Sequence, residues 1–295
     1  MSTGTNREPG VVDLATEVLT IGNVLPVRHR DVVPGRPFRT PEVVLDAMAC
    51  GPYRAAAASI VGLGHLAAGG CRQDAFGLFA SGPDRLCAVL ADGLGSRPVS
   101  QLGAHLFVES VGTLLSGDRQ PVAVELVEEA NERVRRFATE VHARPEGDLA
   151  CVGMVALISP AGVDLAWVGD VSAFTVAGED FVEVIEPEDK YVNLVSRTLC
   201  APDLAGHVES LTLTMPPAGA LCLATDGLAA DIRNSPAVRG WLGARWRVPL
   251  TAFAFGDSLR FRRQGSHDDR TAVAVWRCGT EPAAGSEPDR QQTVA

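Results

Sequence analysis

The sequence has no run of lysine and arginine, no Cys-x-x-Cys pair and no apolar run long enough to cross a membrane. Its 26 basic and 36 acidic residues give a formal net charge of −10. This balance argues against a surface that binds nucleic acid or anionic lipid. Residues 149–163 form the longest uncharged apolar run, but they contain glycine and proline and are too few to span a bilayer.

The cysteines also lack the spacing of a zinc or redox motif. Several of the seven lie inside apolar runs, which is typical of small buried side chains in a reducing compartment (Cys50, Cys71, Cys87, Cys151, Cys200, Cys222, Cys278). The first 25 residues show no basic start followed by an apolar stretch, so no secretory signal is expected. We therefore expect a cytoplasmic protein that does not enter the membrane.

Proline distinguishes the first part of the chain from the rest. Residues 1–54 hold six prolines that favour extended loops over an independent core (Pro9, Pro26, Pro34, Pro37, Pro41, Pro52). We expect this N-terminal extension to drape over a domain formed by residues 55–278, because the hydrophobic content of 46% is ample for one large core. Residues 279–295, rich in Pro, Glu, Gly and Gln, are expected to form a disordered tail.

Acidic residues stand at the ends of four apolar runs. Residues 86–91 predict a buried strand that ends in Asp92 and Gly93, and residues 220–225 repeat the pattern before Asp226. Asp268 and Asp269 precede a third run at 271–276, and Asp74 precedes a fourth at 75–80. If these strands share one end of a sheet, the carboxylates converge, and they stay ionised together only where cations neutralise them.

The remaining pattern is mixed helix and strand. Helices are predicted at 99–115, 126–141 and within 228–264, and strands at 55–62, 150–158, 163–168, 173–176, 181–185, 208–213 and 221–225. The strands between 150 and 185 are predicted to form one meander. Residues 186–207 lack regular alternation, so we expect a mobile loop that borders a functional cleft.

These motifs, in this order, resemble the PPM family, the metal-dependent protein phosphatases of type 2C. The resemblance covers residues 55–278: an acidic loop at 65–75, the Asp-Gly pair at 92–93, two helices, a Val-Gly-Asp turn at 168–170, Thr-Asp-Gly-Leu at 225–228, and a final acidic pair. It implies an α+β fold, a four-layer α/β/β/α sandwich of two antiparallel sheets flanked by helices.

The resemblance also implies a set of site residues and their roles. Asp92 matches a carboxylate that bridges two Mn²⁺ or Mg²⁺ ions, one of which the Gly93 carbonyl also holds. Asp226 and Asp268 match carboxylates on the other ion. Asp74 matches an acidic residue that contacts metal-bound water. Asp170 matches one that supports a third ion in some members.

Two departures from the family pattern affect the expected phosphate contacts. Gln73 stands where a glutamate is usual, and Gly69 stands where an arginine usually grips the phosphate. His65 and Arg72 are the candidate replacements for that phosphate contact. His267, beside Asp268, is a candidate proton donor to the leaving group, although a loop histidine bonded to backbone is at least as common.

The final acidic pair must be divided between two roles, because successive side chains of a strand point to opposite faces. The family motif has Asp and then usually Asn, which puts Asp268 on the ion and gives Asp269 the Asn position. On this pattern Asp268→Asn is expected to be nearly inactive with an unchanged fold, and Asp269→Asn is expected to retain most turnover.

The resemblance implies hydrolysis of phosphoserine and phosphothreonine in a phosphorylated protein, opposing a bacterial serine/threonine kinase. The alternative is a regulatory or interaction module of the same fold with little catalysis, which Gly69 and Gln73 favour. Retention of Asp92, Asp226 and Asp268 favours the enzyme, because convergent carboxylates without ions repel one another at a cost in stability.

Overall fold

The structure, a computed structural model, describes residues 18–24, 40–117, 119–185 and 197–278. Its first sheet has five antiparallel strands in the order β10-β7-β6-β5-β4. The bounds are β4 (Ala75–Ala80), β5 (Leu86–Gly93), β6 (Cys151–Ser159), β7 (Gly162–Val168) and β10 (Glu209–Leu213). A tight turn at residues 81–85 joins β4 to β5 as an antiparallel hairpin.

The second sheet has six antiparallel strands in the order β2-β3-β13-β11-β8-β9. Its strands are β2 (Val43–Cys50), β3 (Tyr53–Ile60), β8 (Ser172–Ala177), β9 (Asp180–Glu183), β11 (Ala220–Ala224) and β13 (Arg270–Arg277). A short parallel pair, β1 (Thr20–Ile21) with β12 (Arg262–Arg263), lies apart from both sheets.

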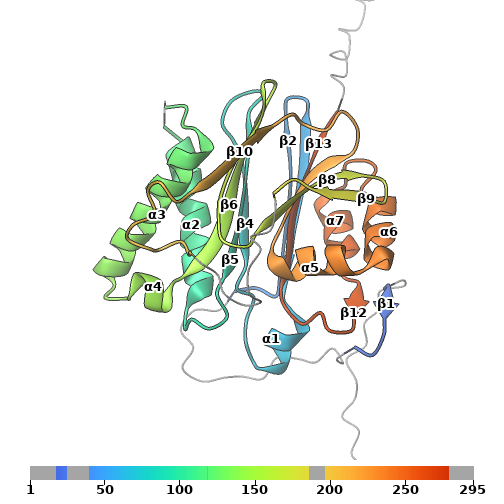
Figure 1. Ribbon diagram of the computed structural model, residues 1–295, viewed down its shortest axis with the longest axis horizontal. Coiled ribbons are helices and arrows are strands. Elements are labelled where there is room, and N and C mark those ends of the chain that lie inside the picture. The colour runs from blue at the N-terminus through green and yellow to red at the C-terminus, as the bar shows by residue number, and fades with distance from the viewer. Residues whose placement is uncertain (1–17, 25–39, 118, 186–196, 279–295) are drawn as a thin grey trace, which may run out of the picture.

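Helices cover the outer face of each sheet (Figure 1). On the five-stranded sheet lie α2 (Ser100–Leu115) and α3 (Ala123–Glu140), followed by the short α4 (Pro145–Asp148). On the six-stranded sheet lie α5 (Asp226–Asn234), α6 (Pro236–Arg245) and α7 (Ala252–Ser258), while α1 (Leu63–Ala67) lies at one end of the sandwich. The fold is therefore the expected four-layer α/β/β/α sandwich.

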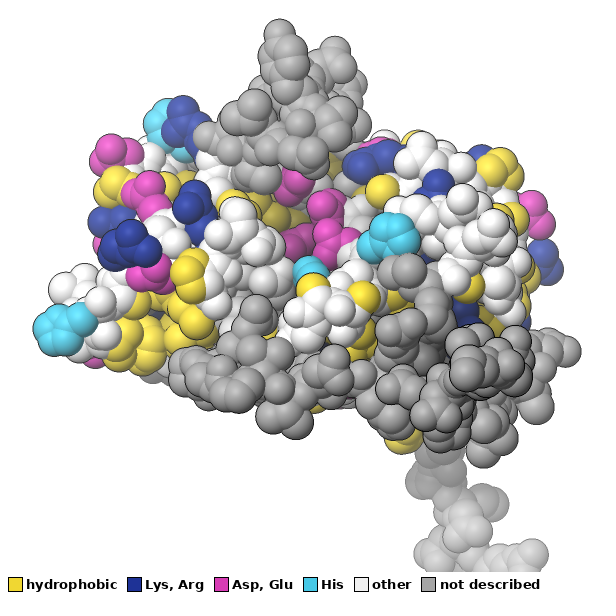
Figure 2. All heavy atoms as spheres, turned by 90° about the horizontal axis from the view of Figure 1, so that it is seen from below, with side chains coloured by type: hydrophobic (Ala, Val, Ile, Leu, Met, Phe, Trp, Pro, Cys, Tyr) yellow, Lys and Arg dark blue, Asp and Glu magenta, His cyan; other side chains and the backbone are white. Residues whose placement is uncertain are grey.

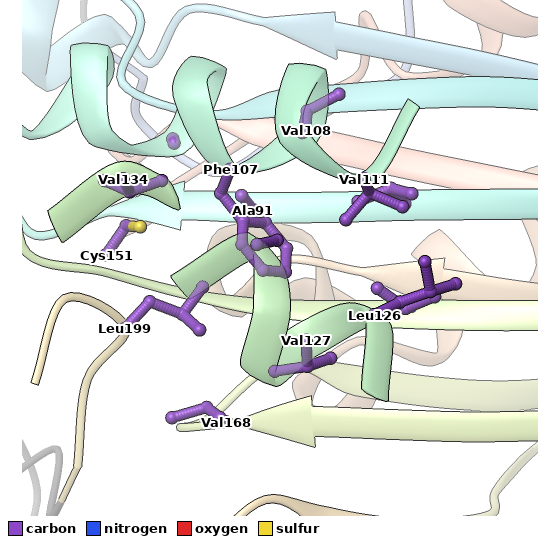
Figure 3. Close-up of a cluster of buried hydrophobic side chains, with 14 of the residues drawn as sticks. Ala91, Phe107, Val108, Val111, Leu126, Val127, Val134, Cys151, Val168 and Leu199 are labelled. Carbon is purple, nitrogen blue, oxygen red and sulfur yellow. The ribbon is translucent and has the colours of Figure 1, made fainter. Parts of the chain in front are cut away.

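Three apolar clusters separate the four layers. One fills the space between the sheets, one lies between the five-stranded sheet and α2 and α3, and one lies beneath α5, α6 and α7. In the cluster under α2 and α3, Phe107 points between the two helices and the strands (Figure 3). The sheets are buried on both faces, which explains why β5 and β6 are almost continuously apolar.

Helix α3 shows how the sequence forms this cluster. Leu126, Val127, Ala130 and Val134 recur at helical spacing and are buried, so one stripe of the helix faces the sheet. The Glu125 carboxylate accepts a hydrogen bond from the backbone N–H of residue 122 at 3.2 Å, which caps the first turn. None of the helices among the described residues is long and apolar enough to cross a membrane.

Three expectations about segments need correction. Residues 43–50, assigned to an N-terminal extension ending at 54, form the edge strand β2, because Pro41 and Pro52 bound the strand instead of preventing it. The predicted meander is divided: β6 and β7 lie in one sheet and β8 and β9 in the other. The chain changes sheets at Gly169, whose φ of 89° suits glycine.

The third correction concerns residues 186–207, which were expected to form a mobile loop. Within its described part, Leu199, Cys200 and Leu204 are buried in the cluster under α2 and α3. Asn131 of α3 accepts a hydrogen bond from Cys200 N at 2.6 Å and donates one to the carbonyl of residue 201 at 3.1 Å. Residues 197–207 therefore pack on the domain, while residues 186–196 and the tail 279–295 lie outside the described residues.

Gly103 provides a test of how closely α2 approaches the chain before β6. A Cβ at Gly103 would overlap the carbonyl oxygen of Leu149, and both residues are buried. We expect Gly103→Ala to lower the free energy of unfolding by about 1–3 kcal/mol, because backbone must move to relieve the overlap. Urea denaturation measures the change.

The matched control is Gly117→Ala. A Cβ there would lie 3.8 Å from the nearest atom, the Leu114 carbonyl oxygen, so the change is expected to stay within about 0.5 kcal/mol. Equal losses in both variants would show that helix packing at Gly103 is looser than described.

Candidate active site

The carboxylates predicted to converge come from strand ends at one end of the sandwich. Asp92 lies near the end of β5, and Asp226 begins α5 directly after β11. Because β11 and β13 are antiparallel neighbours, the end of β11 lies beside the start of β13, where Asp268 stands. Asp170 lies in the turn between β7 and β8, where the chain changes sheets.

Figure 2 shows this end of the molecule, and acidic side chains gather in a hollow near its centre. The pKa of Asp92 is raised well above its usual range, first by burial and then by the charges of its acidic neighbours Asp74, Asp226, Asp268 and Asp170. The charged groups that act most on this carboxyl are thus themselves carboxylates. Asp74, Asp170, Asp226 and Asp268 therefore lie near enough to Asp92 for their charges to act on its carboxyl.

The pKa of Asp226 is raised by the same two causes, burial and neighbouring negative charge. Burial, followed by the charges of Asp268 and Asp170, raises its pKa to about 6, while the Asp92 carboxyl within hydrogen-bonding reach lowers it. Burial raises the pKa of Asp170 above its usual value, although a backbone hydrogen bond and the charge of Arg233 oppose the shift. Because the carboxyl groups of Asp92 and Asp226 lie within hydrogen-bonding reach of each other, they either share a proton or need a cation between them.

Hard divalent ions fit this donor set. Carboxylate oxygens and a backbone carbonyl are the ligands that Mg²⁺ and Mn²⁺ prefer, and the cluster offers both kinds. Gly93 permits a close approach here, because a Cβ would come within 2.9 Å of the Gln73 carbonyl oxygen and of the Ser100 backbone. The residues that could hold the ions are Asp92, Gly93, Asp170, Asp226 and Asp268.

Asp74 lies beneath this cluster and is only 1% exposed. Its Oδ2 accepts hydrogen bonds from the hydroxyls of Thr225 at 2.9 Å and Thr271 at 2.6 Å. Burial raises its pKa most, with the charge of Asp269 next, and the two threonine hydroxyls lower it. The threonines precede Asp226 and follow Asp269 in the chain, so each acidic motif also supplies a hydroxyl that orients Asp74.

Arg72, one of the two candidates for phosphate binding, points away from the site. Its side chain is buried at 1% exposure and donates from Nε to the Pro41 carbonyl at 3.0 Å and from Nη1 to Ser59 Oγ at 2.9 Å. It also bonds the Asp74 carbonyl. Its donors serve the backbone under the site, so we do not propose Arg72 as a phosphate ligand.

His65, the other candidate, lies at the margin of the acidic cluster. Its Nδ1 is 2.9 Å from Asp269 Oδ1, and its Nε2 is 3.7 Å from Asp268 Oδ1. The hydrogen bond to Asp269 is the main cause that raises the pKa of His65 to about 9, with the charges of Asp268 and Asp74 adding to it. His267 is exposed, and its carbonyl accepts a hydrogen bond from Gly64 N at 2.8 Å.

Asp268 and Asp269, which lie just before β13, differ in exposure and in their contacts. The Asp268 side chain is 55% exposed, whereas that of Asp269 is 1% exposed. Asp269 Oδ1 accepts from Gly62 N at 2.7 Å, and Oδ2 accepts from Gln73 N at 2.5 Å. Asp269 thus connects the segments on either side of α1, which contain Gly62 and Gln73, to the start of β13. Sequence spacing alone does not indicate this role.

The buried side of α5 holds a second charged group, centred on Asp231, that the sequence analysis did not identify. Asp231 is buried and accepts hydrogen bonds from Arg263 at 2.9 Å, Arg270 at 2.9 Å and Ser266 at 2.7 Å. These contacts fix the loop before Asp268 against α5, which carries Asp226. A groove of about 330 Å³ runs beside this loop and borders Asp268; Ile60, Leu66 and Phe261 are among its lining residues.

Asp269→Asn is the informative substitution here. An amide has one acceptor oxygen, so an NH₂ group must face one of the three N–H donors that the carboxylate now satisfies. We expect the variant to lose about 1–3 kcal/mol of unfolding free energy in excess EDTA. The expectation from the family pattern, that Asp269→Asn retains most turnover, stays a prediction about activity.

Asp268→Asn is the matched control for this measurement. It removes a mutually repelling, exposed charge, so metal-free stability should be unchanged or higher. Chemical denaturation in EDTA measures the free energy of unfolding of both variants. A larger decrease for Asp268→Asn than for Asp269→Asn would contradict the described orientation of the pair.

Comparison with known proteins agrees with this geometry. The family model described as Protein phosphatase 2C matches residues 61–255, more than half of the chain. None of the curated proteins matches the sequence.

Among solved structures, the serine/threonine phosphatase Stp1 from Staphylococcus aureus is 14% identical, with a TM-score of 0.58 over 84% of this chain and 100% of that chain. The catalytic domain of the phosphatase PstP, in complex with two manganese ions, is 17% identical, with a TM-score of 0.55 over 77% and 99%. RsbX in complex with magnesium is 16% identical, with a TM-score of 0.52 over 79% and 98%. The fold is shared with all three, and by the family model the chain belongs to the protein phosphatase 2C family.

Proposed function

We propose that the protein hydrolyses phosphoserine and phosphothreonine in a protein substrate, using a water molecule activated by divalent metal ions. The observation that carries the proposal is the convergence of Asp92, Asp170, Asp226 and Asp268 at one end of two facing sheets. A cluster of mutually repelling carboxylates costs stability unless cations bind it. A fold that needed only to present a binding surface would have no physical use for it.

Each residue would contribute in its own way. Asp92 would bridge two ions with the Gly93 carbonyl on one of them, Asp226 and Asp268 would hold the other, and Asp170 could support a third. When bound, the ions would supply a water of lowered pKa and neutralise the phosphoryl oxygens. Asp74, held by Thr225 and Thr271, would accept a hydrogen bond from water above it.

A protein substrate suits the surface around the site. The groove that borders Asp268 is long enough to be lined by residues from β2, β3, α1 and the loop before β13, and its lining is largely apolar. It could receive residues that flank the phosphorylated side chain. The proposed partners are therefore a phosphorylated protein and the serine/threonine kinase that modifies it.

A second candidate function is a regulatory module of the same family with weak hydrolysis. The specific observation in its favour is that, within the part of the chain that the structure describes, the Arg72 side chain donates to the Pro41 and Asp74 carbonyls and to Ser59 Oγ, so these donors are not directed at a phosphate. A bidentate arginine contributes strongly to phosphate binding, and its loss weakens substrate affinity. This candidate predicts metal binding without measurable turnover.

Turnover of p-nitrophenyl phosphate should require added Mn²⁺ or Mg²⁺, because the donor set consists of hard oxygen ligands. The same ions should raise the thermal denaturation midpoint, since a ligand that binds only the folded state stabilises it. Assays before and after chelation with EDTA measure both effects. Undiminished turnover in excess EDTA would exclude the metal mechanism, and metal-dependent stabilisation without turnover would favour the regulatory module.

Asp268→Asn is expected to lower turnover by about 10² or more, because it removes one charge that an ion needs to stabilise a phosphoryl oxygen. Steady-state rates at saturating Mn²⁺ measure the loss. Asp257→Asn is the matched control: Asp257 is an exposed carboxylate of α7 paired with Arg260, and its change should leave the rate within twofold. Equal rates for Asp268→Asn and the unaltered protein would remove Asp268 from the ion site.

A further inference from the structure

We propose that His65 Nε2 is a ligand of the metal ion that Asp268 holds, so that the centre contains one nitrogen among its oxygen ligands. The inference rests on the proposed metal site and adds to it a residue that the family motif does not assign. It replaces the phosphate-binding role for which His65 was a candidate in the sequence.

The position of His65 is fixed by its backbone. Gly62 N donates to Asp269 Oδ1 at 2.7 Å, Gly64 N donates to the His267 carbonyl at 2.8 Å, and Gly70 N donates to the His65 carbonyl at 2.6 Å. A Cβ at Gly64 would come within 2.9 Å of that His267 carbonyl, so glycine lets the loop lie directly on the segment before β13. His65 is thereby held beside the acidic pair on rigid contacts.

The orientation of the imidazole is fixed by Asp269. Asp269 Oδ1 accepts from Gly62 N and lies 2.9 Å from His65 Nδ1, and a carboxylate oxygen in this position can only accept. Nδ1 therefore carries a proton whether or not an ion is bound. The pKa of about 9 means that Nε2 is also protonated without an ion, so an ion that binds Nε2 displaces that proton. A buried carboxylate that bonds one ring nitrogen and directs the other at an ion is the usual outer support of a metal-bound histidine.

The distance from Nε2 to its neighbour fits a shared ion. His65 Nε2 lies 3.7 Å from Asp268 Oδ1, too far for a hydrogen bond. Metal–nitrogen and metal–oxygen bonds are each about 2.0–2.2 Å, so one ion can contact both atoms. Both side chains are partly exposed, at 25% and 55%, so an ion can enter. His65, Asp268 and Asp269 are close enough together to form a metal-binding group.

A nitrogen ligand alters which metal the centre prefers. Mg²⁺ favours oxygen ligands throughout, whereas the later divalent metals accept imidazole readily. We expect His65 to strengthen binding of Mn²⁺ more than that of Mg²⁺.

The test uses the full chain loaded with Mn²⁺ and pulsed electron paramagnetic resonance, which detects nitrogen nuclei bonded to the ion. The unaltered protein should show ¹⁴N modulation, and ¹⁵N-histidine labelling should replace it with the ¹⁵N pattern. His65→Asn should abolish the signal, because the shorter amide can still donate to Asp269 but has no atom at the Nε2 position.

Two matched variants serve as controls. His267→Asn alters the exposed histidine next to Asp268, and His142→Asn alters one at the end of α3 whose φ of 55° asparagine also tolerates. Both should keep the nitrogen signal. Loss of the signal in His267→Asn with retention in His65→Asn would overturn the assignment.

Calorimetric titration gives a second readout that does not depend on turnover. Changes to outer-shell partners alone cost 10–100-fold in metal affinity, so His65→Asn should weaken Mn²⁺ binding by about 10-fold or more, and Mg²⁺ binding by less. Mn²⁺ that binds the unaltered protein without any nitrogen modulation would refute the nitrogen ligand and leave the proposed function intact. Absence of Mn²⁺ binding would refute both.

Discussion

Electrostatic repulsion at one end of the sandwich is the constraint on which the rest of the site depends. Two sheets aim Asp92, Asp226 and Asp268 at the same small volume, and burial raises the pKa of Asp92 and Asp226. The fold can maintain this arrangement because the strands beneath are held by three apolar clusters. Packing energy elsewhere therefore offsets the cost of an acidic centre, which is common for functional sites.

A layer of buried polar contacts connects that centre to the core. Arg72 bonds Ser59, Ser59 bonds Thr271 at 2.5 Å, and Thr271 bonds Asp74. Each member is satisfied by its neighbour, so the charge of Arg72 partly balances the acidic groups above without reaching the cleft. Arg72 therefore contributes its positive charge to the site from below and does not line the cleft. Its sequence position next to Gln73 suggested a different role, that of a phosphate ligand.

The four layers were predicted by the resemblance to a known family, which rests on the order of the motifs. The acidic residues of the site were indicated by the ends of the apolar runs. The sequence was insufficient where contacts between residues far apart in the chain determine an element or the role of a side chain. Strand β2 was missed because Pro41 and Pro52 resemble loop signals, and an edge strand alternates weakly. The role of Asp269 was missed because its partners Gly62 and Gln73 lie 207 and 196 positions away. Arg72 failed as a phosphate candidate for the same reason: only tertiary contacts reveal that it is buried.

The position of β13 has a consequence for the order of assembly during synthesis. This strand is the last described element in the chain, yet it lies between β3 and β11 near the middle of its sheet, and the acidic pair directly precedes it. Until the ribosome releases it, the two halves of that sheet have unpaired edges facing each other. Domains generally fold as units during translation, so this one stays open until its end emerges. The acidic centre, which includes Asp268, is thus incomplete in every nascent chain that ends before β13.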